Sequence, residues 1–99
     1  MRLRRDRFGD LVRRQLDLFA EDEAGLLREA DQAERAYDEA EREEAEELYG
    51  DYQLVLETVA DRLGELRDTY AATLDEDAAE EYAAAFERAA RRRHPRVRL

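Results

Sequence analysis

Carboxylates crowd one stretch of this chain at spacings that could support chemistry. The stretch contains Glu41, Glu43, Glu44, Glu46 and Glu47. Residues three or four apart share a helix face, and helical bundles hold pairs of metal ions with glutamates arranged in this way. Such sites also use a histidine three residues after a glutamate, and no histidine lies near this run. We therefore expect a solvated acidic face, with no metal site and no cofactor.

Few other groups in the chain could act in catalysis. His94 is the single histidine, and it precedes Pro95 in an arginine-rich segment without a neighbouring acid to orient the imidazole. The chain has no serine, cysteine or lysine, so the usual nucleophiles reduce to threonine, tyrosine and carboxylates. The absence of cysteine also excludes disulfides and thiol chemistry. We expect no catalytic residues and a protein that is not an enzyme.

Arginines gather near both ends of the chain, and acids gather between them. Residues 1–14 carry a net charge of +4, residues 88–99 carry +6, and residues 15–87 carry −20. Guanidinium groups bind carboxylates and phosphates. The predicted surface for an anionic partner consists of Arg2, Arg4, Arg5, Arg88, Arg91, Arg92, Arg93 and Arg96.

Two kinds of anionic partner are compatible with these arginines. The net charge of −10 opposes long-range attraction to nucleic acid, which is therefore possible but not favoured. Arginines in a last helical turn also interact favourably with the helix dipole. The arginine-rich C-terminal segment can moreover dock on the acidic middle of its own chain or of a neighbouring copy. We favour the docking interpretation.

Strong helix formers run through almost the whole chain, and the only proline is Pro95. We predict an all-α fold, an elongated helical hairpin or three-helix bundle with coiled-coil-like seams. The clearest seam alternates steps of three and four between Tyr49 and Tyr70. The expected order is a basic lead-in at 1–9, a single helical domain at 10–93 with helices at about 10–49, 51–73 and 76–93, and a basic tail at 94–99.

Smaller signals mark the ends of these elements. Apolar residues recur along one face of the first predicted helix, and Glu23 interrupts this apolar stripe. The third helix can be capped by Thr73 with Glu76 or by Asp77 with Glu80.

The tyrosines fall on the helical seams, where we expect their rings to pack in the core. The alternative is that they form a surface for a partner. They are Tyr37, Tyr49, Tyr52, Tyr70 and Tyr82.

The junction at Gly50 allows two arrangements. Gly50 can end one helix in the left-handed conformation, and Asp51 can cap the next, which gives a sharp reversal. Alternatively, one long helix continues through Gly50, and a short C-terminal helix folds back on it. A single interior glycine costs about 1 kcal/mol, so the helix would tolerate it. We favour the reversal.

A reversal at Gly50 leaves residues 10–24 projecting from the bundle. Their apolar side chains would then be exposed, so we predict a self-association surface made of Leu11, Val12, Leu16 and Phe19. The expected protein is a cytoplasmic homodimer without a membrane span. Its predicted function is a non-catalytic protein–protein interaction or scaffolding module. The alternative is a small nucleic-acid-associated or regulatory protein that uses its arginine-rich ends.

Overall fold

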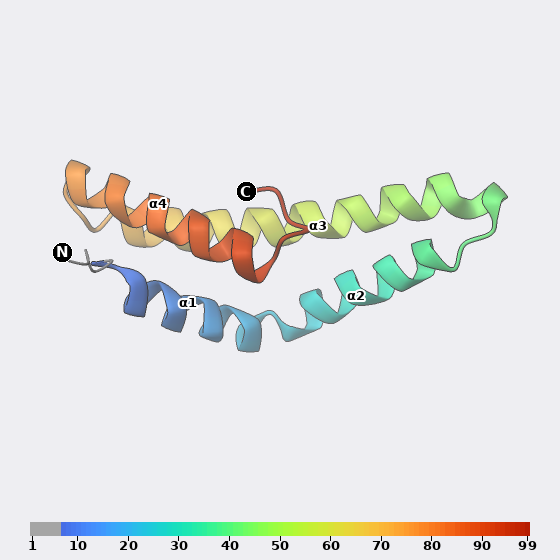
Figure 1. Cartoon of the computed structure of the whole chain (residues 1–99), viewed down its shortest axis with the longest axis horizontal. Coiled ribbons are helices and arrows are strands. Elements are labelled where there is room, and N and C mark those ends of the chain that lie inside the picture. Colours follow the sequence, from blue (N-terminus) through green and yellow to red (C-terminus); the bar gives the residue numbers. More distant parts are fainter. Residues whose placement is uncertain (1–6) are drawn as a thin grey trace, which may run out of the picture.

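The computed structural model describes residues 7–99, which form four α-helices and no β-strand. They are α1 (Gly9–Asp22), α2 (Ala24–Asp38), α3 (Arg42–Ala71) and α4 (Glu76–Arg93). α3 runs the length of the molecule, α1 and α2 follow one another along it, and α4 folds back beside its C-terminal half (Figure 1). The molecule measures 54 × 32 × 21 Å. The predicted all-α, elongated fold is confirmed.

α3 passes through Gly50 without interruption, so the chain does not reverse there. The predicted boundary between helices at 10–49 and 51–73 is therefore wrong, and the alternative of a continuous helix describes this segment. Gly50 is exposed, its φ angle is not positive, and nothing lies within 4 Å of where a Cβ atom would be. The contacts of a 30-residue helix outweigh the cost of one interior glycine.

The chain reverses instead between α2 and α3. Glu39 is the C-cap of α2, and Glu41 precedes α3 with an extended backbone at φ −70° and ψ 156°. Glu43 and Glu44 occupy the first turn of α3, where carboxylates interact favourably with the helix dipole. No residue of this turn has a positive φ angle, so no glycine is needed. Acidic residues at a helix start mark the reversal.

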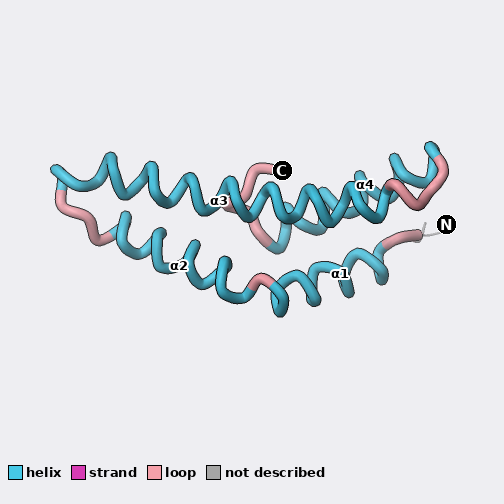
Figure 2. The backbone as a smooth tube through the Cα atoms, turned by 180° about the vertical axis from the view of Figure 1, so that it is seen from behind, coloured by secondary structure: helices cyan, strands magenta, loops and turns pink. Residues whose placement is uncertain are grey.

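α1 and α2 together resemble one helix bent at Glu23. The Glu23 amide donates to the carbonyl of Phe19 at 2.8 Å, and the Leu27 amide donates to the carbonyl of Glu23 at 3.0 Å. The Glu23 carboxylate accepts a hydrogen bond from Arg62 of α3 at 2.8 Å. The bend lets α1 pack against α4 while α2 packs against α3 (Figure 2). The bend lies at Glu23, the residue that interrupts the apolar stripe in the sequence.

α1 does not project from the bundle, because α4 covers it. Val12 and Leu16 are 1% exposed, and the hydroxyl of Tyr82 in α4 donates to Gln15 Oε1 at 2.7 Å. The expectation that residues 10–24 project is therefore wrong. α1, α3 and α4 share the core, in which four side chains are 0% exposed: Val59, Leu63, Tyr82 and Phe86.

α4 spans Glu76–Arg93, the range expected for the third helix. Its N-cap is Asp75, whose Oδ1 accepts a hydrogen bond from the Ala78 amide at 2.9 Å. The predicted caps Thr73 and Asp77 do not fill this position, because Thr73 closes the end of α3 and Asp77 lies within α4. The capping carboxylate fixes where α4 starts and therefore which of its faces meets α1.

Candidate functional site

An open groove of about 500 Å³ lies between α1 and α4. Its floor is apolar, with Val12 and Leu16 from α1 and Ala85 and Ala89 from α4. Each pair is spaced by four residues and therefore occupies one face of its helix. The alanines leave the depression open, since larger side chains at these positions would fill it.

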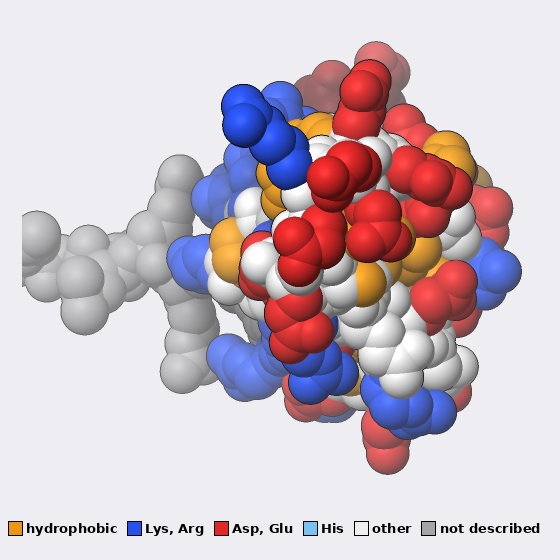
Figure 3. Space-filling view, turned by 90° about the vertical axis from the view of Figure 1, so that its right-hand side faces the viewer, with side chains coloured by type: hydrophobic (Ala, Val, Ile, Leu, Met, Phe, Trp, Pro, Cys, Tyr) orange, Lys and Arg blue, Asp and Glu red, His pale blue; other side chains and the backbone are white. Residues whose placement is uncertain are grey.

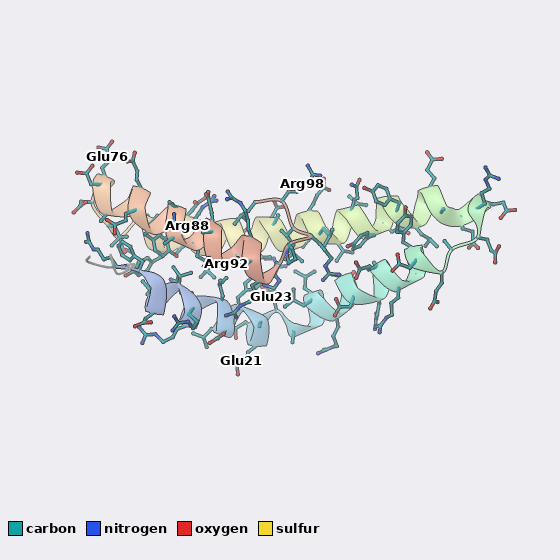
Figure 4. All side chains as sticks on the ribbon, in the orientation of Figure 1. Glu21, Glu23, Glu76, Arg88, Arg92 and Arg98 are labelled. Atoms are coloured by element: carbon teal, nitrogen blue, oxygen red, sulfur yellow. The ribbon has the colours of Figure 1, made fainter. Side chains whose placement is uncertain are left out.

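Arginines line the rim of this groove. Arg93 donates to Asp17 at 2.7 Å, and Arg13 donates to Asp10 at 3.1 Å. Arg92 is exposed on the last turns of α4, one turn after the labelled Arg88 (Figure 4). No carboxylate of residues 7–99 lies within ion-pair distance of Arg92. This arginine-rimmed groove therefore combines an apolar floor with a rim that has more arginines than acidic partners.

The groove joins two sets of residues that the sequence predicted as separate sites. Val12 and Leu16 belong to the predicted self-association surface, whereas Arg92 and Arg93 belong to the predicted surface for an anionic partner. They meet because α4 returns along α1. Arg13 and the alanines of the floor were not predicted. Small residues four apart on α4, followed three positions later by an arginine, are the signal that could have identified the groove.

The other residues of the predicted self-association surface contact the chain's own core. Leu11 is partly buried against the core, and Phe19 is 6% exposed. The Phe19 ring meets the ring of His94 edge-on, with centroids 6.1 Å apart. The large apolar side chain that α1 does expose is Leu18, at 57%. The four predicted residues therefore form no exposed apolar patch on α1.

The C-terminal segment 94–99 folds back toward α2 and α3 (Figure 1). Arg96 donates to Glu34 Oε1 at 2.7 Å and to Asp31 Oδ1 at 3.1 Å, both in α2. Val97 is 8% exposed and belongs to the core. The arginine-rich segment thus docks on acidic residues of its own chain, as one of the two docking alternatives predicted.

The remaining predicted arginines have different surroundings. Arg91 contacts Glu87 at 3.5 Å, and Arg88 is exposed on α4. Glu87 also accepts from Arg67 of α3 at 2.9 Å, so this carboxylate is shared between two helices. Arg2, Arg4 and Arg5 lie outside the described residues.

The turn between α2 and α3 carries concentrated negative charge. We call residues 38–47 the acidic tip; it has seven acids and one arginine. Within residues 7–99, none of these acids has an arginine at ion-pair distance. Figure 3 views this end of the molecule, where acidic side chains gather with hydrophobic ones visible between them. Over the same described range, no three carboxylate or histidine groups converge to hold a metal ion.

Three tyrosines pack across the hairpin beside the acidic tip. The ring centroid of Tyr37 lies 5.0 Å from that of Tyr49 and 6.5 Å from that of Tyr52. Burial, together with the negative charge of Glu34, raises the pKa of Tyr52. Tyr52 is 8% exposed and Tyr49 is 43% exposed. One tyrosine therefore belongs to the interior, as expected, and another presents its ring to solvent.

Comparison of the chain with known protein families, with curated proteins and with solved structures finds no match. Among the helices of residues 7–99, none combines the length and the apolar character that crossing a bilayer requires.

Proposed function

We propose that this protein is a non-catalytic interaction or scaffolding module whose arginine-rimmed groove binds an acidic, amphipathic helical segment of a protein. The observation that carries the proposal is Arg92, an exposed guanidinium without an acidic partner among residues 7–99, next to the buried Val12 and Leu16. A helix in such a groove places apolar side chains on the floor and carboxylates against the rim. The arginines of the rim attract the acidic helix and orient it through charge-assisted hydrogen bonds. The floor, in which Val12 and Leu16 are already buried, gives the groove its shape.

A protein partner is favoured over nucleic acid by the state of the other arginines. Arg93 is held by Asp17, and Arg96 is held by Asp31 and Glu34. Binding to a phosphate backbone relies on several arginines that each neutralise a phosphate. Arginines that already have carboxylate partners contribute less to such binding. Nucleic-acid association remains the alternative, and the same experiment addresses it.

The proposal is tested by following backbone amide chemical shifts during titration with a synthetic acidic amphipathic helical peptide. We expect shifts for groove residues of α1 and α4, and we expect Arg92→Glu to weaken peptide binding at least about tenfold. Arg35→Glu makes the same charge change at an exposed position of α2 and should bind the peptide like the wild type.

Two outcomes would contradict the proposed function. In the first, the peptide leaves the groove amides unchanged even in large excess, or binds Arg92→Glu as well as it binds the wild type. In the second, a DNA duplex titrated in place of the peptide shifts the same amides and binds with a steep salt dependence. The second result would support the nucleic-acid alternative.

A further inference from the structure

The arm of the molecule, residues 24–57 of α2 and α3, buries little of its apolar surface. It is two helices thick, and within it only Ala30 and Tyr52 are buried. Tyr49 and Leu54 are 43% and 63% exposed. The buried core cluster lies outside the arm, where α1, α3 and α4 meet. The arm therefore exposes single large apolar side chains, of which Tyr49 lies next to the acidic tip.

The charge of the arm restricts what can cover it. Residues 24–57 contain twelve acids and three arginines. Two arms placed side by side in the same direction would bring like charges together and repel each other. The arginine-rimmed groove lies in the other half of the molecule and has the opposite charge at its rim. Two copies in opposite directions place each arm next to a groove.

We propose that the partner is a second copy of this chain, and that two molecules pair antiparallel with the acidic tip of each in the arginine-rimmed groove of the other. The pairing rests on the proposed function, in which the groove takes an acidic helical segment. Each tip brings carboxylates without internal partners to Arg92, and Tyr49 next to the tip supplies an apolar ring for the floor.

A two-fold arrangement also accounts for both surfaces at once. It uses both tips and both grooves, so the assembly closes at two copies. The broad face of the molecule measures 54 × 32 Å. A stable interface buries about 800 Å² on each partner, which is about half of that face. The molecule is therefore large enough for this dimer.

Charge reversal on each side of the contact tests the pairing, with oligomeric state measured by sedimentation velocity. The groove variant is Arg13→Glu with Arg92→Glu. The tip variant replaces Asp38, Glu39, Glu46 and Glu47 with arginine, which changes the net charge of the tip from −6 to +2. Alone, each variant opposes like charges, so its dimer dissociation constant should rise at least about tenfold above that of the wild type. In an equimolar mixture every contact joins opposite charges, so a heterodimer should form. Circular dichroism establishes that both variants remain helical.

A control variant separates this contact from the effect of net charge. Arg14→Glu with Arg98→Glu changes the net charge as much as the groove variant does, at two exposed positions outside the groove, the tip and the arm. The control should dimerise like the wild type. If the control variant dissociated as readily as the groove variant, the proposal would be overturned. A wild type that is monomeric at high micromolar concentration, or a mixture that remains monomeric, would overturn it as well.

The two proposals fail in distinguishable ways. A monomeric wild type that still binds the acidic peptide in its groove overturns the dimer and leaves the proposed function in place, with a different protein as the partner. A wild type that neither dimerises nor binds the peptide overturns both.

Discussion

At the scale of single residues, His94 lies where α4 ends and the C-terminal segment turns back. Its Nε2 atom is buried and has no hydrogen-bond partner among the described residues. Burial, followed by the positive charges of Arg93 and Arg96, lowers the pKa of His94. Protonation would place a charged N–H among groups that offer no acceptor. The folded chain therefore favours the neutral imidazole, and we expect the docking of the C-terminal segment to weaken in mild acid.

His94→Gln should make the stability less sensitive to mild acid. The pKa of His94 is about 6.5 in the unfolded chain and lower in the folded chain, so its contribution to stability is present above pH 6.5 and is lost as the pH falls below that value. Between about pH 7 and about pH 5.5, the free energy of unfolding should fall more steeply with decreasing pH for the wild type than for His94→Gln. The two slopes should differ by at most about 1.4 kcal/mol per pH unit. Urea unfolding across this range measures both slopes, and equal slopes would exclude the effect.

At the scale of elements, the continuity of α3 predicts how Gly50 responds to substitution. Gly50→Ala should stabilise the protein by about 0.4–1 kcal/mol, because alanine restricts the unfolded chain and fits the helical backbone without contacts. Gly64→Ala is a useful comparison, since its Cβ would lie 3.7 Å from the Arg67 guanidinium, an ordinary contact. Thermal unfolding measures both. Destabilisation by Gly50→Ala would indicate a left-handed glycine and a reversal at this position.

The sequence allows the helical content and the start of the last helix to be predicted, but not the pairing of the helices. The seam from Tyr49 to Tyr70 identifies one face of a helix, and that face is the same whether the chain reverses at Gly50 or earlier. The glycine suggested a turn. Favourable carboxylates at a helix start contribute only about 0.3–1 kcal/mol each, so the true reversal near Glu41 left a weak signal.

Individual residues of the candidate site could be predicted from the sequence, but their proximity in the fold could not. The sequence singled out Val12 and Leu16 as apolar surface and Arg92 as a cation. Their proximity depends on α4 returning parallel to α1, which follows from the shared core around Tyr82 and Phe86. Contacts between residues so far apart in sequence leave no local pattern, so one sequence alone does not indicate them.

At the scale of the whole molecule, charge follows the long axis. The acidic tip occupies the α2–α3 end, and the groove with Arg92 lies in the other half (Figures 3 and 4). The C-terminal segment lies between them, where Arg96 binds Asp31 and Glu34 of α2. A rod with such an axis can join its copies in two ways. An antiparallel pair is closed, whereas end-to-end contacts from tip to groove continue into a filament.

Small-angle X-ray scattering distinguishes these two arrangements by length. One molecule is 54 Å long. The antiparallel pair overlaps over more than half of each rod, so its longest dimension should exceed 54 Å by less than half. End-to-end contact would give a particle about twice as long as the monomer, and longer ones at higher concentration. Growth of the longest dimension with concentration would rule out the closed pair.

The contacts of α1 also set an order of events during synthesis. Tyr82 reaches Gln15 across 67 positions, and Arg93 reaches Asp17 across 76. A nascent chain therefore presents Val12 and Leu16 uncovered until α4 has been made. α2 and α3 are neighbours in sequence and can pair much earlier, because a short loop closes at a low entropic cost. Of the four helices, α1 thus emerges from the ribosome before the others and is the last to reach its final place.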